Sequence, residues 1–146
     1  MPKKPIYRAG MILYHITDGV PEMLFMRPSN PKYGGDDFQC CKGKIDDGET
    51  SLEAAIREAQ EEVGLFVPNI DGEIRPLGRF LGRTDFFVAR VKDKTAFGEP
   101  LTPEEVDETR WMTLDQFITS GRKLHVPVVK AAKRLIDKVE ADEANG

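Results

Sequence analysis

The stretch Gly43–Leu65, GKIDDGETSLEAAIREAQEEVGL, organises the rest of the chain. Its apolar residues recur at helical spacing, which predicts an amphipathic helix. Thr50 followed three residues later by Glu53 forms a capping box, and Gly64 suits the left-handed position after the last turn. The sequence therefore predicts a single helix between Thr50 and Gly64.

Three carboxylates share one face of this predicted helix. Glu58, Glu61 and Glu62 stand at i, i+3 and i+4, roughly 120° from the apolar stripe. Like charges at this spacing repel by about 0.2–0.5 kcal/mol per pair. Such a face is either solvated surface or a cation site, and a hard cation such as Mg²⁺ or Mn²⁺ removes the repulsion through oxygen ligands.

The spacing of these residues resembles the Nudix box, G-x5-E-x7-R-E-U-x-E-E-x-G-U, where U is a bulky apolar residue. Gly43, Glu49, Arg57 and the run from Glu58 to Leu65 match its positions, with Ala59 smaller than the usual residue. Seven fixed matches by accident have a probability on the order of 10⁻⁸ per start site. The box covers about a sixth of the chain, and weaker similarity on both sides extends over nearly all of it.

The resemblance implies a metal site and supporting residues within the box. The expected metal ligands are the carboxylates of Glu58, Glu61 and Glu62 and the carbonyl of Gly43, with Mg²⁺ as the cofactor and Mn²⁺ as an alternative. Arg57 is expected to orient the catalytic Glu61, although an ordinary surface ion pair at this spacing is the other interpretation. Glu49 is expected to brace the loop against the helix.

A further acidic residue is expected ahead of the only tryptophan. The run Glu105–Trp111 is similar to the E-x5-W pattern of dinucleoside polyphosphate hydrolases, which makes Glu105 a catalytic candidate. Taken alone, this loop carries solvated charges. The choice of general base between Glu105 and Glu61 stays open.

Basic and aromatic residues outside the helix are candidates for substrate contacts. Basic side chains here either hold phosphates or are ordinary surface charge, and an aromatic ring can stack on a base. The expected substrate contacts are Arg8, Arg27, Lys42, Lys44 and Tyr33.

Composition places the chain among soluble globular domains. Its 146 residues suit a single domain over residues 1–146, and a net charge of −4 provides no global basic field for nucleic acid. The adjacent Cys40 and Cys41 rarely have the geometry to bridge each other. Without a disulfide framework, a secretory signal or a long apolar run, we expect a cytoplasmic protein with no membrane partner.

The pattern along the chain predicts an α/β protein. The resemblance implies the Nudix fold, an α/β/α sandwich with a mixed β-sheet between helices. Residues 142–146 are expected to form a mobile tail. The predicted strands cover residues 6–16, 22–27, 38–44, 73–82, 85–92 and 109–113, and further helices cover residues 114–119 and 126–140.

The expected function is metal-dependent hydrolysis of a pyrophosphate bond in a nucleoside diphosphate linked to another moiety. A dinucleoside polyphosphate is favoured by Glu105–Trp111, by the run Phe38–Gly43 and by Tyr7–Arg8, which also resembles the start of RNA 5′-pyrophosphohydrolases. Cys41 stands where those groups usually carry proline. The alternatives are ADP-ribose or a nucleoside triphosphate as substrate and, more remotely, a non-catalytic nucleotide-binding module; an RNA 5′ end is a less favoured partner.

Overall fold

The computed structural model describes residues 5–30, 32 and 37–145, and its centre is a mixed sheet. The strands follow the order β4-β5-β1-β2-β6, and β3 also pairs with β1. The strand bounds are β1 Arg8–Thr17, β2 Val20–Pro28, β3 Cys41–Lys44, β4 Ile70–Phe80, β5 Thr84–Val91 and β6 Val106–Met112. The α-helices are α1 Ser51–Val63, α2 Leu114–Ser120 and α3 Val126–Asn145, and the 3-10 helices are η2 Val67–Asn69, η3 Pro103–Glu105 and η4 Lys123–His125.

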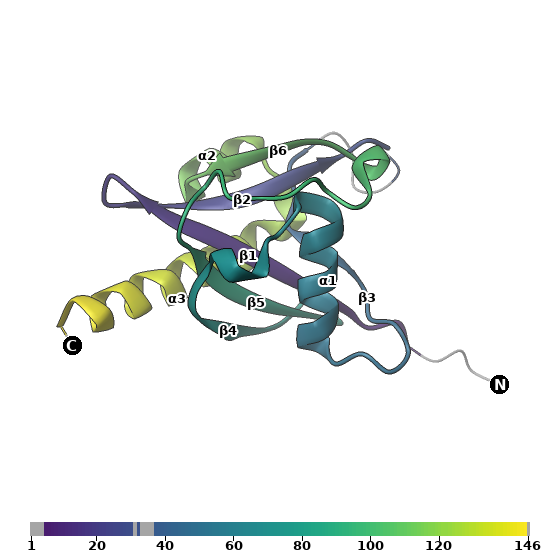
Figure 1. The fold of residues 1–146 in the computed structure, drawn as a ribbon, viewed down its shortest axis with the longest axis horizontal. Helices are drawn as coiled ribbons and strands as arrows, with labels where there is room; N and C mark the ends of the chain where they lie inside the picture. Colours follow the sequence, from purple (N-terminus) through teal and green to yellow (C-terminus); the bar gives the residue numbers. More distant parts are fainter. Residues whose placement is uncertain (1–4, 31, 33–36, 146) are drawn as a thin grey trace.

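Helices cover both faces of the sheet (Figure 1). The side chains of β1 alternate between the two layers: Ile12 joins a core cluster with residues of α2 and α3, whereas Met11 and Leu13 join a cluster with α1. Three fully buried alanines of α1, at positions 54, 55 and 59, allow this helix to lie close to the sheet. The structure confirms the predicted Nudix α/β/α architecture.

One edge of β1 is divided between two partners. Its second half, from Tyr14, pairs antiparallel with β2, and its first half, from Arg8 to Met11, pairs antiparallel with β3. The other edge pairs in parallel with β5. Because β2 and β3 share one edge of β1, the start of β1, the end of β2 and all of β3 meet at one end of the sheet.

Several element boundaries differ from the predictions. The last strand begins at Val106 rather than at residue 109, because β6 pairs with β2 back to Pro28. Helix α3 continues to Asn145, beyond the predicted end at residue 140, because Ala141, Glu143 and Ala144 are good helix formers. In the described part of the chain, no helix combines the length and apolar character needed to cross a membrane.

Candidate active site

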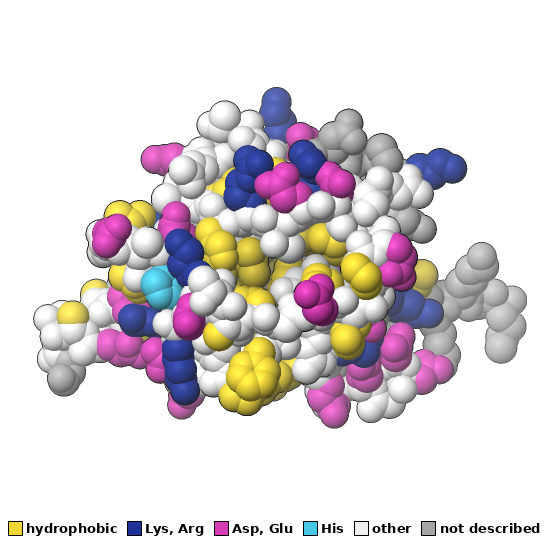
Figure 2. All heavy atoms as spheres, turned by 45° about the horizontal axis from the view of Figure 1, so that its top comes forward, with side chains coloured by type: hydrophobic (Ala, Val, Ile, Leu, Met, Phe, Trp, Pro, Cys, Tyr) yellow, Lys and Arg dark blue, Asp and Glu magenta, His cyan; other side chains and the backbone are white. Residues whose placement is uncertain are grey.

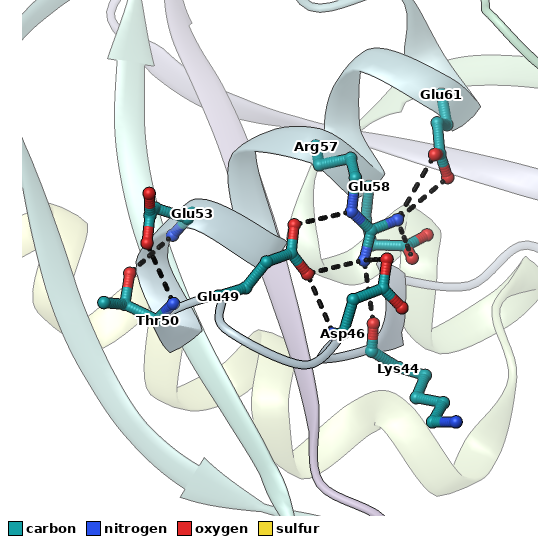
Figure 3. Close-up of polar contacts among 8 residues, drawn as sticks. All are labelled: Lys44, Asp46, Glu49, Thr50, Glu53, Arg57, Glu58 and Glu61. Atoms are coloured by element: carbon teal, nitrogen blue, oxygen red, sulfur yellow. Dashed lines mark hydrogen bonds and ion pairs between the residues drawn. The ribbon is translucent and has the colours of Figure 1, made fainter.

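Helix α1 begins and ends as its sequence predicts. The backbone N–H of Glu53 donates to Thr50 Oγ1 over 3.1 Å, and the backbone N–H of Thr50 donates to the Glu53 carboxylate over 2.9 Å (Figure 3). Gly64 closes the helix with a φ of 71°, in the left-handed region. These caps satisfy backbone groups at both ends and fix the register of the acidic face.

Arg57 ties the helix to the loop that precedes it. Its guanidinium contacts acidic groups from that loop and from α1 itself, and it also donates to the carbonyl of Lys44 at the end of β3 over 2.8 Å (Figure 3). This network holds the pKa of Glu49 below its ordinary value, mainly through the hydrogen bond from Arg57. The carboxylates of the network are Asp46 at 3.4 Å, Glu49 at 2.8 Å, Glu58 at 2.9 Å and Glu61 at 3.2 Å.

Glu58 and Glu62 form a buried pair on the same helix. The Glu58 side chain is 12% exposed and Glu62 is 9% exposed. Burial raises the pKa of both carboxyl groups, and their mutual repulsion raises that of Glu62 further. The Cys41 thiol donates to Glu62 Oε2 over 3.5 Å. Ionisation of both members of the pair is therefore unfavourable unless a further positive charge is bound beside them.

Gly43 lets strand β3 pass directly against this pair. A Cβ at position 43 would collide with the Glu58 carboxylate, so any side chain here would displace that group. The glycine of the box is thus explained by close approach rather than by an unusual backbone angle.

The carboxylate pair fits a hard divalent cation. Mg²⁺ is commonly held by one or two protein carboxylates and completes its shell with water and phosphate oxygens. Across residues 5–30, 32 and 37–145, no three Asp, Glu, His or Cys side chains are grouped so that they could hold a metal ion. Of the three predicted carboxylates, the structure brings Glu58 and Glu62 together, while Glu61 is bonded to Arg57.

An open pocket of about 510 Å³ lies against this pair. The start of β1, the end of β2, strand β3, helix α1, the turn η3 and the segment after α2 all contribute to its wall. The lining residues are Arg8, Met26, Lys32, Gln39, Cys40, Lys42, Gly43, Glu58, Glu62, Glu105 and Arg122. Figure 2 shows one face of the molecule on which acidic and basic side chains are mixed, so charge on that face is not gathered into one large basic patch.

Glu105, the acidic candidate ahead of the tryptophan, is one of the residues that line this pocket. It ends η3, a turn that the Thr102 N–H and hydroxyl anchor to the Glu61 carbonyl on α1, each over 3.0 Å. The backbone N–H of Ser29 donates to the Glu105 carbonyl over 3.1 Å. The Glu105 side chain is exposed, so it can reach solvent or a bound substrate without desolvation cost.

The predicted substrate contacts differ in whether they line the pocket. Arg8 and Lys42 line the pocket. Arg27 instead forms ion pairs with Asp107 and Glu108 of β6, because β2 pairs with that strand. The pocket lining does not include Lys44, although its carbonyl accepts from Arg57. Tyr33 lies outside the described residues.

Sequence reasoning missed Arg122 and assigned no role to Gln39 at the pocket wall. Arg122 follows α2 and reaches the pocket because Gly121 forms a bridge with Phe38, a contact between residues far apart in the chain. Only the glycine that ends α2 signals a change of chain direction there.

The two cysteines face different layers and are both free and buried. Burial raises the pKa of the Cys40 thiol to about 12 and raises that of Cys41 well above its ordinary value. Neutral, inaccessible thiols are poor nucleophiles, so catalysis through a covalent cysteine adduct is disfavoured.

Comparison with known proteins identifies the family. The NUDIX domain model matches residues 6–134. A Caenorhabditis elegans Ap4A hydrolase binary complex is 19% identical with a TM-score of 0.71, over 94% of this chain and 99% of that one. A mutT/nudix family protein from Listeria innocua is 21% identical with a TM-score of 0.71, over 96% and 99%.

The NUDIX domain of Shewanella oneidensis NrtR, in a complex with ADP ribose, is 14% identical with a TM-score of 0.65, over 92% of this chain and 90% of that one. At these identities the likeness to solved structures shows the fold alone. A search among curated protein sequences gave no match. Since the family model spans most of the chain and the box residues Gly43, Glu58 and Glu62 line one pocket, the protein belongs to the Nudix family and is a pyrophosphohydrolase.

Proposed function

We propose that this pyrophosphohydrolase cleaves dinucleoside polyphosphates and depends on Mg²⁺ or Mn²⁺. The observation that carries the proposal is the single pocket whose wall combines the buried pair Glu58 and Glu62 with the basic residues Arg8 and Lys42. A polyphosphate chain with a divalent cation supplies the charges that such a wall lacks. The E-x5-W resemblance and the Ap4A hydrolase fold support the same substrate class.

In this proposal the carboxylate pair holds the cation beside the scissile phosphates. Glu58 and Glu62 would be its protein ligands, with the Gly43 carbonyl as a third candidate from the wall of the pocket. When bound, the cation neutralises phosphate charge and lowers the pKa of a water molecule. Arg57 keeps Glu58 in position by donating a hydrogen bond to its carboxylate.

Proton transfer is assigned to Glu105. Its carboxylate is exposed at the pocket wall, and its backbone is anchored to α1 through Thr102. A carboxylate in this place can accept the proton of the attacking water, a role worth about 10²–10⁴-fold in rate. Glu61 is the other candidate for the base, but its carboxylate is held by Arg57.

A substrate panel tests the proposal. A dinucleoside tetraphosphate, ADP-ribose, a deoxynucleoside triphosphate and a 5′-triphosphorylated RNA are each assayed with Mg²⁺, with Mn²⁺ and with chelator, and products are resolved by mass. We expect the dinucleoside tetraphosphate to have the highest kcat/KM by about tenfold or more, which is about 1.4 kcal/mol in transition-state free energy. We also expect chelator to abolish turnover. A preference for ADP-ribose or the triphosphate would reject the substrate, and turnover in chelator would reject the metal dependence.

A further inference from the structure

Four basic side chains line the pocket, and apart from Lys32 they come from elements around the central sheet. Arg8 begins β1, Lys42 lies in β3, and Arg122 follows α2. Burial, followed by the charges of Arg8 and Arg122, lowers the pKa of Lys42, and all three side chains line the same pocket. Among the residues that the structure describes, none forms an ion pair with any of the three.

Their lack of ion pairs distinguishes the three cations from the other arginines on the strands and on α1. Most described arginines on the strands and on α1 are neutralised by carboxylates within the fold; they are Arg27, Arg57, Arg75, Arg79, Arg90 and Arg110. A group of like charges without ion-pair partners is unfavourable unless a ligand supplies the opposite charge. A phosphate group does so, and arginine binds it through two parallel hydrogen bonds.

Arg122 is held firmly in place by its backbone. Its N–H donates to the Phe38 carbonyl over 2.7 Å, and its own carbonyl accepts from the His125 N–H over 2.9 Å. The preceding Gly121 is required because a Cβ there would collide with the Phe117 ring. Both backbone groups of Arg122 are therefore fixed before any ligand binds.

The side chain of His125 provides a further contact between the segment of Arg122 and the segment of Phe38. Its Nδ1 accepts the backbone N–H of Cys40 over 3.1 Å, and the ring is fully buried. The segment 38–40 is thus joined to the segment 121–125 by contacts that we call the seam. The seam consists of the bridge between Phe38 and Gly121, which includes the hydrogen bond from Arg122 to Phe38, and of the hydrogen bond from Cys40 to His125. The seam sets the position of Arg122 relative to Lys42, which lies two residues beyond Cys40.

Lys42 also connects this group to the carboxylate pair. Lys42 and Glu62 each shift the pKa of the other toward the charged form, so they lie near one another. A phosphate bound by Arg8, Lys42 and Arg122 would therefore lie in the same pocket as the cation site but on side chains of other elements. The group would hold a phosphate beyond the two that flank the scissile bond.

We propose that Arg8, Lys42 and Arg122 form a cradle for a third phosphate, with Arg122 as the specificity-determining residue that favours substrates of three or more phosphates over nucleoside diphosphate sugars. This inference rests on the proposed function, because it assigns the phosphate chain of that substrate to residues. A nucleoside diphosphate sugar has a sugar in the position of the third phosphate, so the three cations do not increase its affinity. A nucleoside triphosphate and a dinucleoside polyphosphate share the third phosphate.

The first measurement uses inorganic ligands in the presence of chelator. Calorimetry compares tripolyphosphate and pyrophosphate binding to the wild type, Arg122→Gln and the control Lys123→Gln, which removes one charge at the exposed neighbouring position. We expect Arg122→Gln to weaken tripolyphosphate about 10- to 100-fold, as for a lost charge-assisted contact, and pyrophosphate about threefold at most. Lys123→Gln should change either affinity by about twofold at most. Equal losses in the two variants, or equal losses for the two anions, would overturn the cradle.

The second measurement uses substrates with Mg²⁺. Arg122→Gln should lower kcat/KM for the dinucleoside tetraphosphate and for a nucleoside triphosphate about 10-fold or more, with ADP-ribose changed about threefold at most. Arg122→Lys keeps the charge but lacks the two parallel N–H donors of the guanidinium. Its kcat/KM should lie between those of the wild type and of Arg122→Gln. A wild type that binds tripolyphosphate through Arg122 yet hydrolyses only ADP-ribose would reject the proposed function while the cradle stands. A wild type that prefers the tetraphosphate with no change in Arg122→Gln would reject the cradle alone.

Discussion

Two groups of charged side chains in this protein differ in whether they have ion-pair partners within the fold. Around Arg57, one cation contacts four carboxylates from the loop and from α1 within 3.4 Å, so each of these carboxylates is matched by a direct cationic partner inside the fold. In the pocket, Glu62 and the cations Arg8, Lys42 and Arg122 lack such direct partners among the described side chains. Matched charges hold the geometry of the box, whereas the pocket leaves charges unmatched for a cation and a polyphosphate. Glu58 belongs to both groups, which links structure to chemistry.

The largest effect is expected at the unmatched carboxylate. Glu62→Gln should lower kcat on the order of 10³-fold, because a charged ligand of the cation is lost. Its melting temperature should stay level or rise, since burial already disfavours the charged form of Glu62. Steady-state kinetics at saturating Mg²⁺ and a thermal scan measure both quantities.

Glu61→Gln provides the comparison, because Arg57 already holds that carboxylate. We expect a smaller loss of kcat than for Glu62→Gln. A larger loss would mean that Glu61 leaves Arg57 to join the cation, and near-native turnover of Glu62→Gln would refute the metal site itself.

A second substitution tests the exposed carboxylate at the pocket wall. Glu105→Gln should lower kcat about 10²-fold, as for a lost general base, and change stability by about 0.5 kcal/mol at most. The control is Glu104→Gln, since Glu104 is exposed in the same 3-10 turn but does not line the pocket. If both variants keep wild-type activity, the base is Glu61 rather than Glu105.

The third prediction concerns the pH dependence of stability that arises from His125, whose ring belongs to the seam. Burial, with help from Lys42 and Arg122, lowers the pKa of His125 from 6.5 to about 3. Because the folded pKa lies below the unfolded one, this neutral histidine stabilises the fold above pH 6.5. That stability is lost as pH falls toward 3, by at most about 1.4 kcal/mol per pH unit.

The measurement compares chemical unfolding of the wild type and His125→Asn between pH 7 and pH 4. Glu58 and Glu62 have raised pKa values and act in the opposite direction, gaining stability when protonated, but they are present in both proteins. The wild type should therefore lose stability more steeply than the variant. Parallel profiles would show that His125 is not held neutral in the fold.

The smallest expected effect is stabilisation by the cation. Mg²⁺ at roughly a hundred times its dissociation constant should stabilise the fold by about 2.7 kcal/mol, which raises the melting temperature by several degrees. The double variant Glu58→Gln/Glu62→Gln should lose this increase. An equal increase in the double variant would place the bound cation elsewhere.

The parts that sequence predicts well are those that depend on neighbouring residues. The capping box at Thr50 and the glycine at position 64 appear as predicted, because caps are local hydrogen bonds. The approach of Glu58 to Glu62 also follows from helical spacing. The architecture follows from the family resemblance and from the alternation of apolar residues along β1.

The parts that sequence misses depend on which distant segments meet. Arg27 is paired with β6, and nothing in its local sequence indicates that strand as its neighbour. Arg122 reaches the pocket through the bridge between Phe38 and Gly121, which are far apart in the chain. The basic residues on the strands therefore looked equivalent in sequence, although the fold uses them differently.

Strand β1, whose edges pair with β2 and β3 on one side and β5 on the other, also has a consequence for amide hydrogen exchange. Amides inside such a strand exchange through global unfolding, whereas turns at the edge of a fold exchange through small local openings. The amides of Arg122 and Cys40 lie in the seam, outside the long strands. Their exchange can therefore report occupancy of the pocket against an unchanging background from β1, without any measurement of turnover.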